Sequence, residues 1–122
     1  MKRIAIVEDN PDNRLLATAI LGDDYLIDEY ETGIQALAGL QSNPPDLVLL
    51  DISLPEMDGK VVLSKIRQNE QIAKLPVIAL TAHAMAGDRE MLLAAGFDDY
   101  VEKPILDEQI LIDAIENLLR QK

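Results

Sequence analysis

The sequence contains no cysteine and no tryptophan, and it has one histidine and one phenylalanine among its 122 residues. Without cysteine the chain has neither a disulfide framework nor a thiolate zinc site, and a single histidine excludes a multi-histidine metal site. A chain of this length can still bury a sizeable core without such cross-links. A metal site in this protein would therefore use oxygen ligands, which favours Mg²⁺ or Mn²⁺.

Long apolar runs are also absent. Only about four consecutive apolar residues, Ile4 to Val7, precede Glu8 near the N-terminus, which is too few for a signal peptide. No apolar run approaches the roughly 20 residues of a membrane-spanning helix. These absences predict a cytoplasmic protein that does not insert into a membrane.

Basic residues are scarce. The chain has 11 Lys and Arg against 22 Asp and Glu, which gives a formal net charge of −11. A surface that reads nucleic acid or anionic lipid needs clustered basic side chains, so neither is expected as a direct partner. An acidic chain is better suited to a cation or to a basic patch on another protein.

Five apolar segments of strand length alternate with segments of helical period. The predicted strands are Arg3–Val7, Tyr25–Glu31, Leu47–Leu50, Val77–Leu80 and Asp99–Glu102. The predicted helices run from Pro11 to about Gly22, from a Thr32 cap to about Ser42, from Lys60 to about Glu70, from about Ala86 to Ala95 and from about Asp107 to Arg120. This alternation predicts one α/β domain over residues 1–122, with a doubly wound five-stranded parallel sheet and helices on both faces.

Polar side chains stand where four of these strands end. Ligands of open α/β sheets bind at the carboxyl ends of the strands, so these side chains are expected to converge. They are Glu8, Asp9, Asp51, Thr81 and Lys103. Two carboxylates about 5 Å apart repel by roughly 3 kcal/mol at an effective dielectric constant near 20, and a bound cation would relieve this repulsion. The pattern therefore predicts a Mg²⁺ or Mn²⁺ site at this edge of the sheet.

Three of these residues have two interpretations each. Asp51 is either a third metal ligand or a carboxylate placed to attack phosphorus. Lys103 is either a surface lysine or an ammonium that compensates the acids and binds a phosphoryl oxygen. Thr81 either caps a turn or donates to a phosphoryl oxygen.

Together these residues resemble the receiver domain of bacterial two-component response regulators over essentially the whole chain. The matching segments, in chain order, are Val7–Asn10, Leu50–Gly59, Ala79–Ala82, Tyr100 and Lys103–Pro104. The stretch from Thr81 to Glu90, together with Asn13-Arg14, is more similar to receivers of hybrid kinases and phosphorelays than to those of transcription factors. The resemblance implies the flavodoxin-like strand order 2-1-3-4-5.

The resemblance also implies a site chemistry. Asp51 would accept a phosphoryl group from a sensor histidine kinase, a histidine phosphotransfer protein or a small donor such as acetyl phosphate. Asp9, Asp51 and the backbone carbonyl of Ser53 would hold Mg²⁺, and Glu8 would act through a metal-bound water. Lys103 would bridge to the aspartyl phosphate. The metal and the lysine would then neutralise the charge that develops during transfer.

A switch is implied by the same resemblance. Thr81 would move toward the phosphoryl group and let Tyr100 rotate inward, which would reshape the face formed by the last two helices and the last strand. Ala82 would leave room for the phosphoryl group. His83 is either an ordinary surface residue or a gate for the water that attacks the acyl phosphate. The signal would leave by protein contact or by onward phosphotransfer, and the chain would catalyse only its own phosphorylation and dephosphorylation.

The first helix provides a candidate docking residue. At 100° per residue, the expected buried face contains Asn13, Leu16, Ala17, Ile20 and Leu21. Arg14, Leu15 and Thr18 are then expected to point away from the core. An exposed leucine beside the site is a candidate contact for the phosphodonor, so we take Leu15, with Pro104, as candidate partner contacts.

Three other functions fit part of the pattern. A haloacid-dehalogenase-like phosphatase also uses a strand-end aspartate and Mg²⁺, but it needs a second aspartate where this chain has Ser53. A flavin-phosphate binder needs an anion-binding loop after the first strand, where Glu8 and Asp9 would repel phosphate. A receiver-like binding module that takes no phosphate is the third alternative.

Overall fold

The computed structural model describes residues 1–82, 88–103 and 105–120. Strands and helices alternate along these ranges, and each predicted element is present with ends that differ from the prediction by at most a few residues. The strands are β1 (Arg3–Val7), β2 (Leu26–Tyr30), β3 (Leu47–Asp51), β4 (Val77–Thr81) and β5 (Asp99–Glu102). The helices are α1 (Pro11–Leu21), α2 (Gly33–Ser42), α3 (Gly59–Gln68), α4 (Asp88–Ala95) and α5 (Glu108–Arg120).

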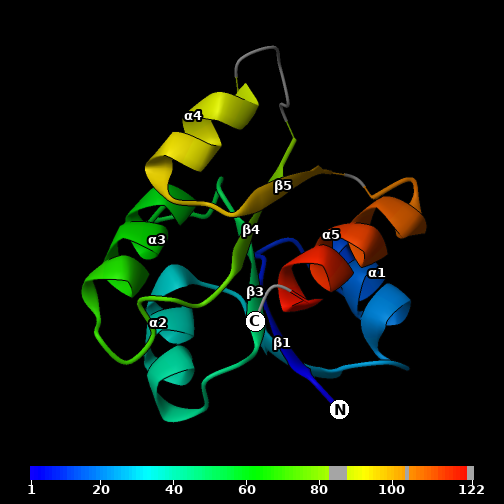
Figure 1. The fold of residues 1–122 in the computed structure, drawn as a ribbon, viewed down its shortest axis with the longest axis horizontal. Helices are drawn as coiled ribbons and strands as arrows, with labels where there is room; N and C mark the ends of the chain where they lie inside the picture. Colours follow the sequence, from blue (N-terminus) through cyan, green and yellow to red (C-terminus); the bar gives the residue numbers. More distant parts are fainter. Residues whose placement is uncertain (83–87, 104, 121–122) are drawn as a thin grey trace.

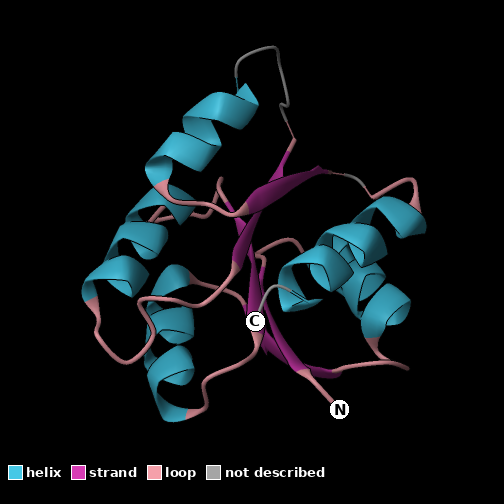
Figure 2. Cartoon of the chain, in the orientation of Figure 1, coloured by secondary structure: helices cyan, strands magenta, loops and turns pink. Residues whose placement is uncertain are grey.

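The strands form one parallel sheet in the order β2-β1-β3-β4-β5, which confirms the predicted fold class and strand order. Helices α1 and α5 cover one face of the sheet, and α2, α3 and α4 cover the other (Figure 1). Figure 2 shows the strands as a single layer between the two helical layers. Because consecutive parallel strands need a crossover, each helix carries the chain back to the start of the next strand.

The sheet separates two hydrophobic clusters. Alternate residues of each central strand point to opposite faces, so Ile4 and Ile6 pack under α1 and α5 while Ala5 and Val7 pack under α2 and α3. All five residues of β3 are buried, as its continuous apolar sequence predicts for a strand covered on both faces. This rigid centre holds the ends of β1, β3 and β4 beside one another.

Short turns connect the carboxyl end of β1 to α1. The side chain of Asn10 accepts hydrogen bonds from the backbone amides of Asp12 and Asn13, at 2.9 and 3.1 Å, and Pro11 occupies the first helical position. Asp58 caps α3 in the same way through the amides of Lys60 and Val61. Both helices therefore begin close to the strand ends that carry the acidic residues.

The exposed side of α1 differs from its prediction. Leu15 is 68% exposed, as expected, but Leu16 is 37% exposed although the helical period places it on the buried face. The expectation that Arg14 and Thr18 point away from the protein is wrong, because both are half-buried. Arg14 folds back over the end of β2, where two glutamates attract its guanidinium group.

Arg67 links three segments at the opposite end of the sheet. Its guanidinium group donates hydrogen bonds to the backbone carbonyls of Ala73, Leu75 and Gly96 at 2.6 to 2.9 Å, and to the carboxylate of Asp98 at 3.1 Å. The same carboxylate accepts from the amide of Val77. One side chain thus ties α3 to the starts of β4 and β5.

We expect Arg67→Ala to lower the free energy of unfolding by about 2 kcal/mol, because hydrogen bonds to a charged group are lost and half-buried carbonyls are left without their donor. Urea unfolding followed by circular dichroism measures this loss. Lys65→Ala, an exposed basic residue of the same helix, is the matched control and should change stability little. Equal stability of Arg67→Ala and wild type would show that the four contacts do not hold these segments together.

Candidate functional site

The register of the sheet brings the predicted residues to one edge. Val7 pairs with Leu50, so the next residues, Glu8 and Asp51, stand at neighbouring strand ends. Asp51 pairs with Leu80, which places Thr81 one residue further along the adjacent strand. Positions that are 43 residues apart in the sequence thus become neighbours through the pairing of β1 with β3.

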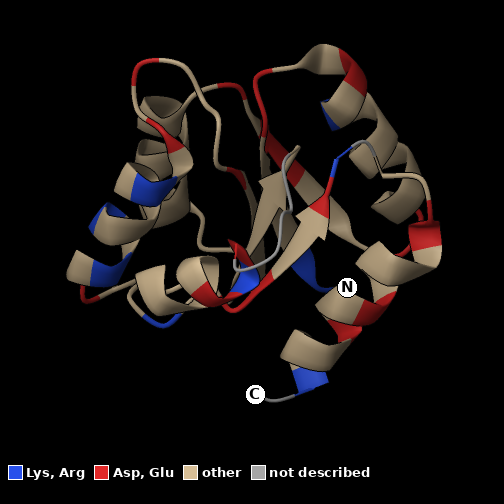
Figure 3. Cartoon of the chain, turned by 90° about the horizontal axis from the view of Figure 1, so that it is seen from above, with Lys and Arg blue, Asp and Glu red and all other residues tan. Residues whose placement is uncertain are grey.

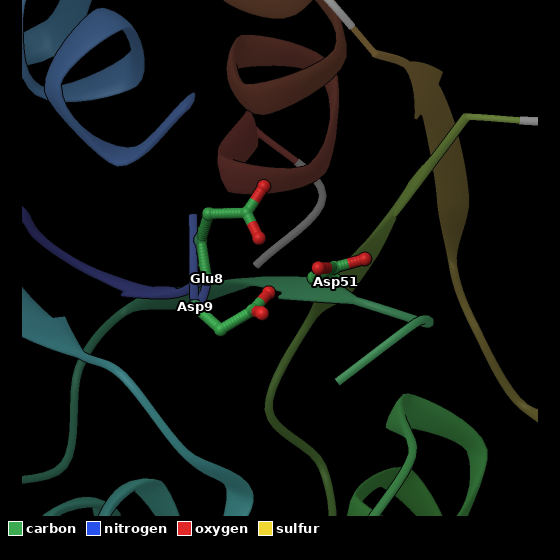
Figure 4. Close-up of side chains that lie close together, drawn as sticks. All are labelled: Glu8, Asp9 and Asp51. Carbon is green, nitrogen blue, oxygen red and sulfur yellow. The ribbon is translucent and has the colours of Figure 1, made fainter. Parts of the chain in front are cut away.

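Three carboxylates meet at this edge. Glu8, Asp9 and Asp51 each offer an oxygen atom, and these atoms all lie within 4.8 Å of one another (Figure 4). Glu8 and Asp51 are buried, with 0% and 1% of their surface exposed, whereas Asp9 is open to solvent. The cluster therefore combines two carboxylates shielded from water with one at the mouth of the site.

Lys103 reaches into the cluster from the end of β5. Its Nζ lies 3.0 Å from Oε1 of Glu8 and 3.0 Å from Oδ1 of Asp51. The lysine side chain is itself only 11% exposed, so these are shielded charge-assisted contacts. If all four groups are charged, three carboxylates and one ammonium carry 1 − 3 = −2.

The environment moves the pKa values of the two buried acids in opposite directions. Burial, followed by the hydrogen bond with Asp51 and repulsion from it, raises the pKa of Glu8 to about 7. Burial also opposes ionisation of Asp51, but hydrogen bonds with Glu8, the Ser53 amide and Lys103, and attraction to Lys103, hold its pKa below the ordinary value. Asp51 is therefore the acid that the site keeps ionised.

The carboxylate of Asp51 is also fixed in direction. The backbone amide of Ser53 donates a 2.9 Å hydrogen bond to Oδ1, the oxygen that Lys103 contacts. Gly59 makes this loop possible, because a Cβ at that position would touch the Asp51 carbonyl and lie 2.6 Å from Cα of Ile52. The start of α3 consequently packs directly against the backbone that carries Asp51.

The donor set fits a hard divalent cation. It consists of carboxylate oxygens without sulfur or nitrogen ligands, and a doubly charged cation would favour the ionised form of all three carboxylates. Oε2 of Glu8 is buried and has no hydrogen-bond partner among the residues that the structure describes. A buried acceptor without a donor is costly, and a cation or its coordinated water would satisfy it.

The other predicted site residues differ in how they lie relative to this cluster. Thr81 is buried at the end of β4, and its backbone carbonyl accepts a 2.8 Å hydrogen bond from the amide of Lys103. Tyr100 is half-buried in β5 and packs against the core under α2, α3 and α4. Ala82 is exposed. His83 and Pro104 lie outside the described residues.

A groove opens beside β5. It has a volume of about 700 Å³ and is formed by α4, β5, α5 and the segment between β5 and α5. Its lining combines apolar side chains with four acidic ones and one basic one: Tyr100, Ile105, Leu106, Ile110, Asp99, Glu102, Asp107, Asp113 and Arg89. Sequence reasoning predicted this face but not its acidic lining.

Comparison with known proteins identifies the family. The family model described as "Response regulator receiver domain" matches residues 4–116. The chain belongs to the response regulator receiver domain family. The resemblance inferred from the sequence is thereby confirmed, and the comparisons lend no support to the phosphatase or to the receiver-like module that takes no phosphate. Receiver domains act in two-component signalling and bind Mg²⁺ at an acidic pocket.

The relatives include sensor kinases and a small response regulator. The chain is 42% identical over 112 residues to the sensor histidine kinase GacS of Pseudomonas protegens, with 88% of this chain and 12% of that protein covered. It is 39% identical to the polar-differentiation response regulator DivK of Brucella ovis, with 85% of both proteins covered. The chain thus spans about one-eighth of the length of the kinase. These relatives agree with the predicted similarity to kinase-associated receivers.

A solved receiver domain has the same fold. The receiver domain of sensor histidine kinase PA1611 of Pseudomonas aeruginosa is 36% identical to this chain, with 97% of both chains covered and a TM-score of 0.87. That structure has a magnesium ion coordinated in its active-site cleft. In the part of the present chain that the structure describes, no helix is both long and apolar enough to cross a membrane.

Asp9→Asn is expected to have opposite effects with and without metal. It removes one charge from three crowded carboxylates, so the metal-free protein should gain about 0.5 to 1 kcal/mol of stability. The substitution also removes the negative charge of one candidate metal ligand. The rise in the midpoint of thermal unfolding that Mg²⁺ gives the wild type should therefore be lost. Thermal unfolding with Mg²⁺ and with chelator measures both effects.

Asp23→Asn is the matched control, because Asp23 is an exposed acid outside the cluster. It should keep the response to Mg²⁺. A wild-type Mg²⁺ response that persists in Asp9→Asn would place the cation elsewhere.

Proposed function

We propose that Asp51 accepts a phosphoryl group from a phosphohistidine on a sensor histidine kinase or a histidine phosphotransfer protein, in a reaction that requires Mg²⁺. The observation that carries this proposal is the state of Asp51: a buried carboxylate that its neighbours hold ionised and oriented. Ser53 and Lys103 both contact Oδ1, so we assign Oδ2 as the attacking atom. An ionised, oriented and shielded carboxylate is what a nucleophile for phosphorus requires.

The transfer balances without another reactant. A bond forms between the Asp51 oxygen and phosphorus while the bond between phosphorus and the donor's imidazole nitrogen breaks. The imidazole keeps the bonding electron pair and takes up a proton. When bound, Mg²⁺, or Mn²⁺ in its place, would supply positive charge against the phosphoryl oxygens.

Eight residues of the chain have roles in this proposal. Asp9, Asp51 and the Ser53 carbonyl would hold the cation, and Glu8 would act through a water bound to it. Lys103 exchanges part of its contact with the carboxylates for a phosphoryl oxygen. Thr81 donates its hydroxyl to the phosphoryl group, Ala82 leaves space for that group, and His83 controls water access. The chain catalyses only its own phosphorylation and dephosphorylation.

In this proposal, residues 1–122 pass the signal to a downstream protein through the groove beside β5. Tyr100 lines this groove together with Glu102, which pairs with Thr81 across β4 and β5. In this proposal, a change at Thr81 reaches the groove wall through that pairing. Apolar side chains with an acidic surround favour a downstream protein segment that is apolar and basic. Figure 3 shows acidic positions along α5, and its acidic residues Glu108, Asp113 and Glu116 are all exposed. Onward phosphotransfer is the second route for the signal.

Incubation with acetyl phosphate tests the phosphoacceptor. With Mg²⁺ or Mn²⁺, intact-mass measurement should detect one added phosphoryl group on the wild type and on Asp23→Asn, and none on Asp51→Asn. Circular dichroism verifies that Asp51→Asn is folded. Labelling that proceeds in chelator, or labelling of Asp51→Asn, would refute the assignment.

Leu15 is proposed as a contact for the phosphodonor, together with Pro104. Leu15 is 68% exposed on α1, and Leu106, which follows β5, is 90% exposed. An exposed leucine on the helix that follows Glu8 and Asp9 offers apolar surface that a docked donor would bury. This proposal concerns recognition of the donor and leaves the chemistry at Asp51 unchanged.

Leu15→Ala should slow phosphotransfer from the cognate phosphohistidine protein by about tenfold, because an apolar contact worth roughly 1 to 2 kcal/mol is lost. The rate with acetyl phosphate should not change. Leu26→Ala, which truncates an exposed leucine on β2, is the matched control. Rapid-quench phosphotransfer with the donor found by kinase profiling gives the rates. An unchanged rate from that donor would show that Leu15 is an ordinary surface residue.

A further inference from the structure

Arg14 of α1 contacts the backbone that carries two of the three acids. Its guanidinium NH1 donates a 2.9 Å hydrogen bond to the carbonyl oxygen of Glu8, and the side chain is only 17% exposed. That carbonyl belongs to the peptide unit between Glu8 and Asp9. Since the orientation of one peptide plane sets the directions of the side chains on both sides, Arg14 fixes how Glu8 points inward and Asp9 outward.

Two glutamates hold the guanidinium group in turn. Nε of Arg14 lies 3.3 Å from Oε1 of Glu29, and NH2 lies 3.6 Å from Oε1 of Glu31. Glu29 lies in β2, and Glu31 directly follows its last residue, Tyr30, whose carbonyl accepts a 3.0 Å hydrogen bond from the amide of Glu8. One hydrogen bond and two ion pairs thus start from three different nitrogens of the planar guanidinium group, a spread that the single ammonium nitrogen of lysine cannot reproduce.

We propose that Arg14 is a positioning residue for the Mg²⁺ site and that Glu29 and Glu31 hold it in place. The proposal rests on the Mg²⁺ site proposed above and adds a residue outside the ligand set. Groups that orient metal ligands commonly contribute tenfold or more to metal affinity. Arg14 does so through the backbone, by keeping the peptide unit of Glu8 and Asp9 in one orientation.

Electrostatics alone predicts the opposite change in Mg²⁺ affinity when Arg14 is replaced. Arg14 is a cation near a cation site, so its removal should strengthen Mg²⁺ binding if only charge matters. A positioning role predicts that its removal weakens binding. The variant Arg14→Lys separates the effect of charge from the effect of positioning, because it keeps the positive charge and loses the planar guanidinium group.

The experiment is a calorimetric titration of the full chain with Mg²⁺ alone. Arg14→Gln should weaken binding by about tenfold, and Arg14→Lys should weaken it in the same direction. Arg120→Gln is the control, because Arg120 is an exposed arginine at the end of α5 whose side-chain hydrogen bond, within the described residues, goes to the nearby Asn117. Urea unfolding in chelator measures the stability of each variant separately.

The outcomes separate the two proposals. If the wild type binds no Mg²⁺, the proposed function fails, and the role of Arg14 fails with it. If the wild type binds Mg²⁺ but Arg14→Gln binds it equally or more tightly and Arg14→Lys binds it unchanged, only the role of Arg14 is overturned. Loss of stability with unchanged affinity would likewise overturn it and make Arg14 a purely structural residue. Should Arg14→Gln fail to fold, Arg14→Lys alone decides the question.

Discussion

The contact of Lys103 with both Glu8 and Asp51 is the interaction on which the site depends. Two carboxylates at 0% and 1% exposure cannot both be ionised side by side at low cost. An ammonium group 3.0 Å from each keeps Asp51 charged, although Glu8 still has a raised pKa. The compensation is incomplete, and this residual negative charge is what makes the edge of the sheet a cation site. Removing the lysine from this position would leave a buried pair of like charges.

Such a contact requires a sheet that is rigid across several strands. Lys103 and Glu8 are 95 residues apart, and they meet because β3 and β4 lie between their strands in a fixed register. The helices on both faces exclude water from those strands (Figure 1). Arg67 anchors the far ends of β4 and β5, so the strand ends that carry Thr81 and Lys103 are positioned from both directions. The fold thus holds the strand ends that carry Glu8, Asp51 and Lys103 in fixed positions, which the proposed phosphoryl transfer requires.

Much of this arrangement could be predicted from the sequence, because it follows from short local patterns of residues. Apolar runs of strand length end in polar residues, and parallel strands place all such ends at one edge, so the meeting of Glu8 and Asp51 follows from pattern and topology. Arg14 and Leu16 could not be placed in this way. Helical period gives the direction in which a side chain leaves the helix, but a long side chain can fold back toward charges on a strand whose position only the tertiary structure defines. Arg14 does this toward Glu29.

The acidic residues behind the net charge of −11 therefore have different structural roles. Asp28 pairs with Arg3, and Asp98 pairs with Arg67. Asp58 accepts a hydrogen bond from the backbone amide of Lys60 at the start of α3. Each of these acids thus has a donor that the fold supplies. In the acidic cluster, by contrast, one lysine faces three carboxylates, and a buried oxygen of Glu8 has no donor within the described part of the chain. Evolution of a stable fold alone would favour neutralising such a cluster, since uncompensated buried charge costs stability. An acidic cluster beside an oriented aspartate fits the Mg²⁺ pocket of the receiver domain family, in which a bound cation would offset this cost.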